Sequence, residues 1–337
     1  MAYVTGTASS LAALLTALRN ACTTNGWALS GNVLHKGGCY AETLVGSTND
    51  DTGIPANWRL IVRAGNGIDG ANALTDAPAS GPRLGPLIAA NEASWPDWDW
   101  PVAYHIHIHD SPDEVYMFVN YGAGAYFQHV GFGKSPSPGN AGTGNWQTGS
   151  IPSTSSGSYR KRVNGACIAP DGGSLNYANQ ETWCPAPFFW GQCLNLSSEM
   201  RLNSQMHGAI GDTDGLPDWS NYINAFLTSG SGDRRVSSAV PIRPLMGYIP
   251  NAWNNEAVLL PCQVLQVRPE SKSSLIGELK HLRFTRNDFI DPGAVITLGP
   301  DKWKVYPCYR KELSVRNGGA QLTHSGTIAM AIRYDGP

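Results

Sequence analysis

The 337-residue sequence carries a formal net charge of −2, and only 15% of its residues are charged, against a usual share of about a quarter. It has no run of about 18 apolar residues, which argues against a membrane-spanning helix, and no basic face, which argues against nucleic acid as the main partner. The N-terminal stretch MAYVTGTASS has neither a positively charged region nor a cleavage site, so we expect no signal peptide.

The seven cysteines are an odd number and include no CxxC pair. A secreted disulfide scaffold normally has an even, dense set of cysteines, so this pattern does not indicate one. We expect most of these cysteines to be reduced and buried. The two nearest in sequence, Cys184 and Cys193, leave a disulfide between them open as an alternative.

One helix is clear near the N-terminus. Its apolar residues recur at helical spacing from Leu11 to Cys22. Ser9 or Ser10 can cap its start, and Gly26 suits the position just after its end. Extended segments follow, including the alternating stretch NWRLIVRAG at residues 57–65, which predicts a strand.

The best-defined unit is an antiparallel meander of three strands in the middle of the chain. It comprises YHIHIHD at residues 104–110, VYMFVNY at 115–121 and AYFQHVGFG at 125–133, with the turn signals SPDE and GAG between them. Residues 134–158 are rich in Gly, Ser and Pro and predict a linker or a long surface loop.

This segment provides a tentative boundary between an N-terminal helix and β domain, residues 1–133, and a second β-rich domain, residues 159–337. A loop inserted between two halves of one sheet is the alternative. In the second half, residues 216–227 predict another helix, and residues 294–299, 302–311 and 326–335 predict strands. The expected fold class is α+β and β-dominated, with antiparallel, sandwich-like sheets, one N-terminal helix and a few short helices.

The histidines of YHIHIHD have two interpretations. On a strand, His105, His107 and His109 project to one side about 6.5–7 Å apart, while Ile106 and Ile108 point into a core. With His129, which could approach the same face, the three histidines could bind a divalent transition metal. Alternatively, they are the polar face of an ordinary strand, turned to solvent or to a partner. We favour this second interpretation, under which His107→Ala costs little stability.

The segment WPDWDW raises the question of sugar binding. Asp97 and Asp99 lie among three tryptophans, and paired carboxylates with stacking aromatics are typical of carbohydrate sites. The alternative is an aromatic brace that packs a loop against the sheet, which we favour. Large aromatics also dominate protein interfaces, so four tryptophans are candidate interface anchors: Trp95, Trp98, Trp100 and Trp146. No GxSxG motif indicates a serine nucleophile.

Several segments together resemble structural proteins of tailed bacteriophage virions. The most specific are W-x-V-Y-P-x-x-R-K at residues 303–311 and A-I-R-Y-D-G-P at residues 331–337. The resemblance implies a non-enzymatic tail or baseplate protein, found in the virion, whose partners are copies of itself and other virion proteins. It implies no catalytic residue and no cofactor. The low charge independently suits a subunit covered by neighbours.

Two other functions remain open at this stage. The first is a host-surface or carbohydrate-binding tail protein that uses WPDWDW. The second is a metal-binding protein that uses the histidine strand.

Overall fold

The computed structural model describes twelve stretches of the chain, and every structural statement below concerns them. They are residues 1–46, 58–77, 81–86, 98–122, 126–136, 144–150, 188–190, 236–237, 259–268, 272–286, 290–307 and 328–337. The predicted helix at 216–227, Cys184 and Cys193 lie outside these residues.

The predicted N-terminal helix is confirmed as α1 (Leu11–Thr24). Ser10 is its N-cap, and the Ser10 hydroxyl accepts a hydrogen bond of 3.1 Å from the backbone N–H of Ala13. After the helix, Gly26 has a φ of +83°, in the left-handed region that favours glycine. The buried side of the helix consists of its apolar residues at helical spacing: Leu11, Leu14, Leu18, Ala21 and Cys22.

A six-stranded antiparallel sheet forms the centre of the molecule, in the order β1-β9-β10-β11-β12-β13. Its strands are β1 (Ala2–Ala8), β9 (Val102–His109), β10 (Glu114–Tyr121), β11 (Tyr126–Lys134), β12 (Asn145–Gly149) and β13 (Phe188–Trp190). The predicted three-stranded meander is confirmed as β9, β10 and β11. Its strands pair antiparallel with their neighbours in sequence, with His105 opposite Phe118 and Phe118 opposite His129.

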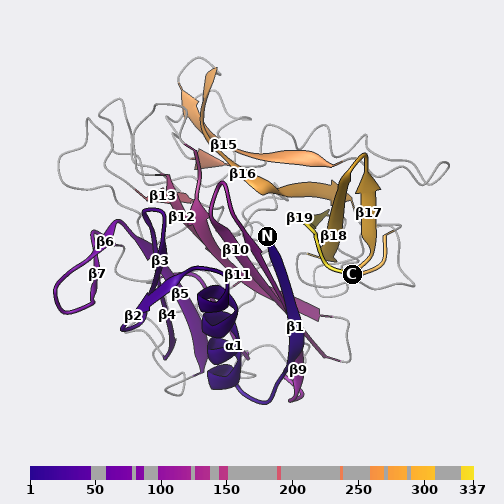
Figure 1. Ribbon diagram of the computed structural model, residues 1–337. Helices are drawn as coiled ribbons and strands as arrows, with labels where there is room; N and C mark the ends of the chain where they lie inside the picture. The colour runs from indigo at the N-terminus through magenta and orange to yellow at the C-terminus, as the bar shows by residue number, and fades with distance from the viewer. Residues whose placement is uncertain are drawn as a thin grey trace, which may run out of the picture.

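A second antiparallel sheet, in the order β2-β3-β4-β5-β8, lies beside α1. Its strands are β2 (Ala28–Ser30), β3 (Val33–Lys36), β4 (Cys39–Gly46), β5 (Arg59–Gly65) and β8 (Arg83–Leu84), and a small hairpin, β6 (Gly67–Ile68) with β7 (Leu74–Thr75), adjoins it. Helix α1 and this sheet together cover one face of the central sheet (Figure 1). The core between them is apolar and includes Leu14, Leu18, Ile106, Ile108 and Val130.

A third antiparallel sheet is formed by the C-terminal half, in the order β14-β15-β16-β19-β18-β17. Its strands are β14 (Val236–Ser237), β15 (Leu260–Arg268), β16 (Lys272–Arg286), β19 (Ile328–Arg333), β18 (Asp301–Pro307) and β17 (Val295–Leu298). It contacts the other face of the central sheet, where the rings of Phe118 and Tyr306 stack with centroids 4.0 Å apart. The expected β-dominated, antiparallel, sandwich-like fold is therefore confirmed, with one helix among the described residues.

Part of the segment predicted as a linker or surface loop is neither. Residues Asn145–Gly149 form β12, which pairs with β11, and Trp146 is fully buried. The segment looked unfit for a core because its residues are polar, but their side chains bond to the second sheet. Asn145, for example, donates its amide N–H to the Gly65 carbonyl oxygen at 2.9 Å.

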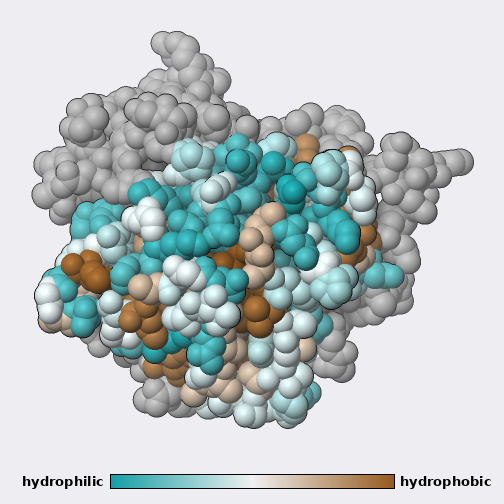
Figure 2. All heavy atoms as spheres, in the orientation of Figure 1, coloured by the Kyte–Doolittle hydropathy of each residue, from teal (hydrophilic) through white to brown (hydrophobic). Residues whose placement is uncertain are grey.

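The surface in Figure 2 is mainly hydrophilic or neutral, with small separate hydrophobic groups. No helix in the described part of the chain is long and apolar enough to cross a membrane. Five large apolar residues in that part are exposed: Met1, Leu29, Trp100, Val295 and Leu298.

Candidate functional site

The histidines of β9 lie on one face of the central sheet, as their spacing predicts. His105 pairs with Phe118 of β10, and Phe118 pairs in turn with His129 of β11. His129 therefore joins the same face, and its ring centroid lies 5.6 Å from that of Phe118. The rings of His107 and His109 are 6.2 Å apart and nearly parallel. The expected convergence of these four histidines on one face is confirmed.

The expectation that this face meets solvent or a partner is wrong. His107, His109 and His129 are at most 2% exposed. The third sheet of the same chain covers them, with Tyr306 of β18 over His107 and His281 of β16 over His109. Tyr306 follows His107 by 199 residues, so no local pattern could reveal this cover.

Three of the imidazoles are held by hydroxyl groups. Nε2 of His107 is hydrogen bonded to the Tyr306 hydroxyl at 2.8 Å, and Nδ1 of His129 to the Ser150 hydroxyl at 3.0 Å. Nδ1 of His105 is hydrogen bonded to the Tyr3 hydroxyl at 2.7 Å. These bonds fix the ring orientations and satisfy nitrogen atoms that would otherwise be costly to bury.

His109 differs from the other three. Its ring stacks on that of His281 with centroids 4.4 Å apart and an interplanar angle of 13°. Neither ring nitrogen of His109 has a hydrogen-bond partner among the described residues, and neither does Nε2 of His281. The stacked pair therefore has three buried ring nitrogens without a hydrogen-bond partner among the described residues.

Burial keeps all these histidines uncharged near neutral pH. It lowers the pKa of His107 and His129 to about 3, and that of His105 and His281 to about 4. The pKa of His109 is also held well below its ordinary value by burial, with further lowering from His281 and His107. Neutral imidazoles serve here as polar aromatic rings that fill the space between two sheets.

The arrangement does not gather these nitrogen atoms around a common point. Among the residues that the structure describes, no group of three or more His, Cys, Asp or Glu side chains could hold a metal ion. His105, His107 and His129 each direct a ring nitrogen to a hydroxyl group, and His109 lies face to face with His281. What the histidines do in this structure is pack and hydrogen bond.

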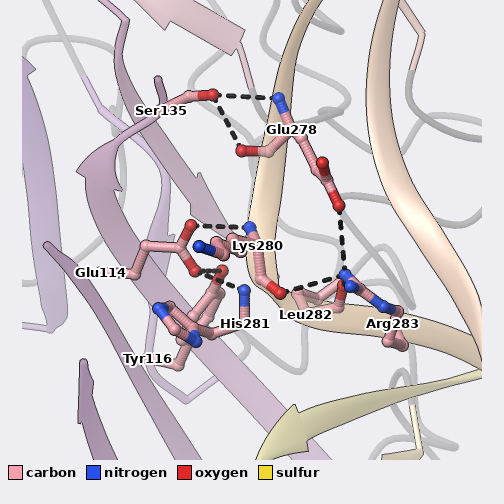
Figure 3. Close-up of polar contacts among 8 residues, drawn as sticks. All are labelled: Glu114, Tyr116, Ser135, Glu278, Lys280, His281, Leu282 and Arg283. Atoms are coloured by element: carbon pink, nitrogen blue, oxygen red, sulfur yellow. Dashed lines mark hydrogen bonds and ion pairs between the residues drawn. The ribbon is translucent and has the colours of Figure 1, made fainter. Parts of the chain in front are cut away.

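Glu114 makes the central polar contact between the sheets (Figure 3). Its Oε1 accepts a hydrogen bond from the backbone N–H of Lys280 at 2.8 Å, and its Oε2 accepts one from that of His281 at 3.0 Å. The Tyr116 hydroxyl donates a third at 2.9 Å. Burial raises the pKa of Glu114 to about 7, although the three donors act in the opposite direction.

The backbone of β16 explains why a buried carboxylate is needed. Cys262 of β15 pairs with Leu279 of β16, but the preceding Pro261 pairs with Arg283. Lys280 and His281 lie in this irregularity without a partner on β15, so their N–H groups need other acceptors. Glu114, the first residue of β10, supplies these acceptors through its two carboxylate oxygens.

Ser135 makes a second bridge to the same strand. Its hydroxyl donates to the carbonyl oxygen of Glu278 at 2.8 Å and accepts from the Glu278 N–H at 2.9 Å. The Glu278 carboxylate in turn lies 3.5 Å from the guanidinium of Arg283 (Figure 3). Together, Glu114 and Ser135 tie β10 and the end of β11 to β16.

The candidate tryptophans separate into buried and exposed residues. Trp146 is fully buried, and Gly133 opposite it leaves room for its ring, because a Cβ there would lie 2.8 Å from that ring. Trp98 is 5% exposed and stacks on Tyr121 in the apolar core. Neither side chain is placed to contact a partner, so their assignment as interface anchors needs correction.

Trp100 is 37% exposed and remains at the surface, whereas Trp95 lies outside the described residues. Of the two aspartates in WPDWDW, Asp99 is exposed and Asp97 lies outside those residues. With Trp98 in the core, the described part of this segment acts as the aromatic brace that we favoured over a sugar platform.

The described cysteines agree with the expectation of reduced, buried thiols. Cys22 and Cys39 are free and buried in the apolar core, and burial raises the pKa of both thiols. Cys262 is also buried.

No protein-family model and no curated protein sequence matches this chain, so its site must be judged from its own residues.

Proposed function

We propose that this protein is a non-enzymatic structural subunit of a tailed-phage virion, in the tail or baseplate. Its work is to bind copies of itself and other virion proteins. The assignment to a virion rests on the resemblance of residues 303–311 and 331–337 to such proteins. The non-enzymatic role is supported by the geometry of the histidine face.

The observation that carries this proposal is the burial of the histidines of β9 and β11. His107, His109 and His129 are the residues best suited to acid–base or metal chemistry, and all three are buried between two sheets of one chain. A catalytic acid or base needs to reach its substrate in a cleft, with a pKa near the working pH. These imidazoles instead pack between the central and third sheets, which supports a structural role for the chain.

A surface that suits assembly lies at the edge of the third sheet. Strand β17 is the last strand of that sheet, and its Val295 and Leu298 are 42% and 59% exposed. Proteins normally protect a sheet edge with charged residues, proline or a bulge, whereas β17 has the sequence VITL. We propose that a neighbouring subunit covers this edge.

The test measures the mass of the purified chain by light scattering over a range of concentrations. We expect a closed oligomer, and we expect Leu298→Lys to shift it towards the monomer because a lysine opposes both apolar contact and strand pairing. Leu29→Lys is the matched control, since Leu29 is a similarly exposed leucine at 40% on the edge strand β2.

A wild-type chain that stays monomeric at every concentration would contradict self-assembly. Equal weakening by Leu298→Lys and Leu29→Lys would contradict the role of β17. Identification of the chain by mass spectrometry in purified phage particles tests the virion assignment separately.

A further inference from the structure

Five of the eight histidines of this chain lie in one layer between the central and third sheets. We call them the histidine layer: His105, His107, His109, His129 and His281. They come from β9 and β11 of the meander and from β16, which lies more than a hundred residues further along the chain. Ring contacts connect the layer, from His109 on His281 at 4.4 Å to His107 against Tyr306 at 5.5 Å.

The surroundings of the layer leave little room for positive charge. Cations approach it from both sheets: the amino terminus of the chain, Lys280 and Arg283 of β16, Lys304 of β18 and Arg333 of β19. Each would repel a protonated imidazole, and the stacked rings of His109 and His281 would repel each other.

The acidic and hydroxyl groups around the layer do not offset this repulsion. The carboxylate of Glu114 is already shared by two backbone N–H groups and a tyrosine hydroxyl, and that of Asp110 is paired with Lys36 and the amino terminus. The carboxylates of Glu278 and Asp301 are paired with Arg283 and Arg333. The remaining polar groups against these rings include the Ser150 hydroxyl and the phenols of four tyrosines: Tyr3, Tyr116, Tyr306 and Tyr334.

We propose that the histidine layer is an acid-sensitive junction, which holds the third sheet on the central sheet when its imidazoles are neutral and releases it when they take up protons. Helix α1 and the second sheet stay packed on the opposite face. The inference does not depend on the proposed virion role.

On the opposite face, no histidine among the described residues is buried. The cluster beneath α1 and the second sheet consists of apolar side chains, with Cys22 and Cys39 as uncharged thiols. Among the described residues, the one histidine outside the layer is His35 of β3, which stacks on Tyr40 and is only half-buried. We therefore expect acid to weaken the packing of the third sheet on the central sheet and to leave the packing of α1 and the second sheet unchanged.

The direction of the pH effect follows from the pKa values. Histidines freed from the junction bind protons as the pH falls below their ordinary pKa of about 6.5, whereas the packed ones resist protonation down to about 4 or 3. The junction is therefore most stable above pH 6.5 and is lost as the pH falls. Glu114 acts in the opposite direction between its ordinary pKa of 4.5 and about 7, because there the packed form holds its proton more tightly.

Hydrogen exchange measured by mass spectrometry tests the release directly. The wild-type protein is labelled between pH 8 and pH 4.5 with a chelator present, and the rates are corrected for the pH dependence of intrinsic exchange. We expect strands β16, β18 and β19 to lose protection near pH 5 while α1, β4 and β5 keep theirs. Loss of protection in both groups at the same pH would overturn the proposal, as would full protection throughout.

Proton uptake provides a second measurement. The slope of the free energy of unfolding against pH gives the number of protons bound on unfolding. On unfolding, each of the five histidines binds a proton and Glu114 releases one. We therefore expect a net uptake of about four protons per molecule between pH 5 and pH 6. An uptake of one proton or fewer would overturn the proposal.

A double variant assigns the effect to the stacked pair. His109→Phe with His281→Phe keeps two stacked rings and removes two titrating groups. We therefore expect the proton uptake on unfolding to fall by about two and the third sheet to lose protection only at a lower pH. His35→Phe is the matched control and should leave both unchanged. An unchanged transition in a folded double variant would contradict the role of this pair; if it does not fold, the wild-type exchange experiment still decides.

Discussion

The two faces of the central sheet differ in the side chains that β9 buries on each of them. The face beneath α1 buries apolar residues such as Ile106 and Ile108, which need no partner beyond close packing. The face beneath the third sheet buries imidazoles and a carboxylate, each of which depends on particular hydrogen bonds or ring contacts. One strand, β9, contributes to both faces. The comparison shows that a polar face in a sequence can be as deeply buried as an apolar one.

The largest expected effect comes from placing a charge on the apolar face. Ile106 is fully buried in the apolar core, so Ile106→Asp places a carboxylate among apolar side chains. We expect it to lower the free energy of unfolding by more than about 4 kcal/mol, enough to prevent folding. Soluble yield and circular dichroism measure this. Thr7→Asp, at an exposed position on β1, is the control. A folded, cooperative Ile106→Asp protein would show that this face is not the core.

The next effect comes from removing the shared acceptor on the polar face. Glu114→Ala leaves the N–H groups of Lys280 and His281 without their acceptor, and we expect a loss of about 3–5 kcal/mol in urea unfolding. Glu42→Ala, which removes a partly exposed ion pair with Arg63, should cost about 1 kcal/mol or less. Equal losses in the two variants would mean that Glu114 does not hold the sheets together.

A smaller but substantial loss is expected at the centre of the histidine layer. His107→Ala removes a buried ring and its hydrogen bond to the Tyr306 hydroxyl, so the cost should be about 2–4 kcal/mol. His35 is half-buried, stacks on Tyr40 and is hydrogen bonded to Ser30, so His35→Ala should cost less, about 1 kcal/mol. Urea unfolding of both variants at pH 8 separates the two cases, and similar small losses would restore the exposed-face interpretation.

The smallest expected effect is at the second bridge between the sheets. Ser135→Ala removes a hydroxyl that both donates to and accepts from the backbone of Glu278, and should cost about 1–2 kcal/mol. Hydrogen exchange at the Glu278 amide measures the local effect. If exchange there is unchanged, Ser135 does not contribute to the contact.

Much of the fold followed from local patterns. The periodicity of residues 11–22 predicted α1, and the period-two alternation of residues 104–133 predicted three strands and their inward isoleucines. The same alternation brought His105, His107, His109 and His129 to one face. By contrast, β12 was missed because its polar residues resemble a loop, and they become buried only through bonds to β5.

The burial of the tryptophans was likewise not predicted from the sequence. The sequence marked Trp98 and Trp146 as large aromatics but not the depth at which they lie, because that depth depends on which elements pack around them. Trp98 meets Tyr121 and Trp146 meets Tyr116, both through contacts formed in the folded sheet.

The division of β9 into an apolar and a polar face was decided by the order of its residues, since side chains alternate along any strand. Which of the two faces would meet water was decided by tertiary structure alone. The residues that cover the histidines, Tyr306 and His281, lie more than a hundred positions further along the chain, and no local propensity carries that information. Burial then changes the chemistry of the same side chains, because an imidazole away from water loses its affinity for protons.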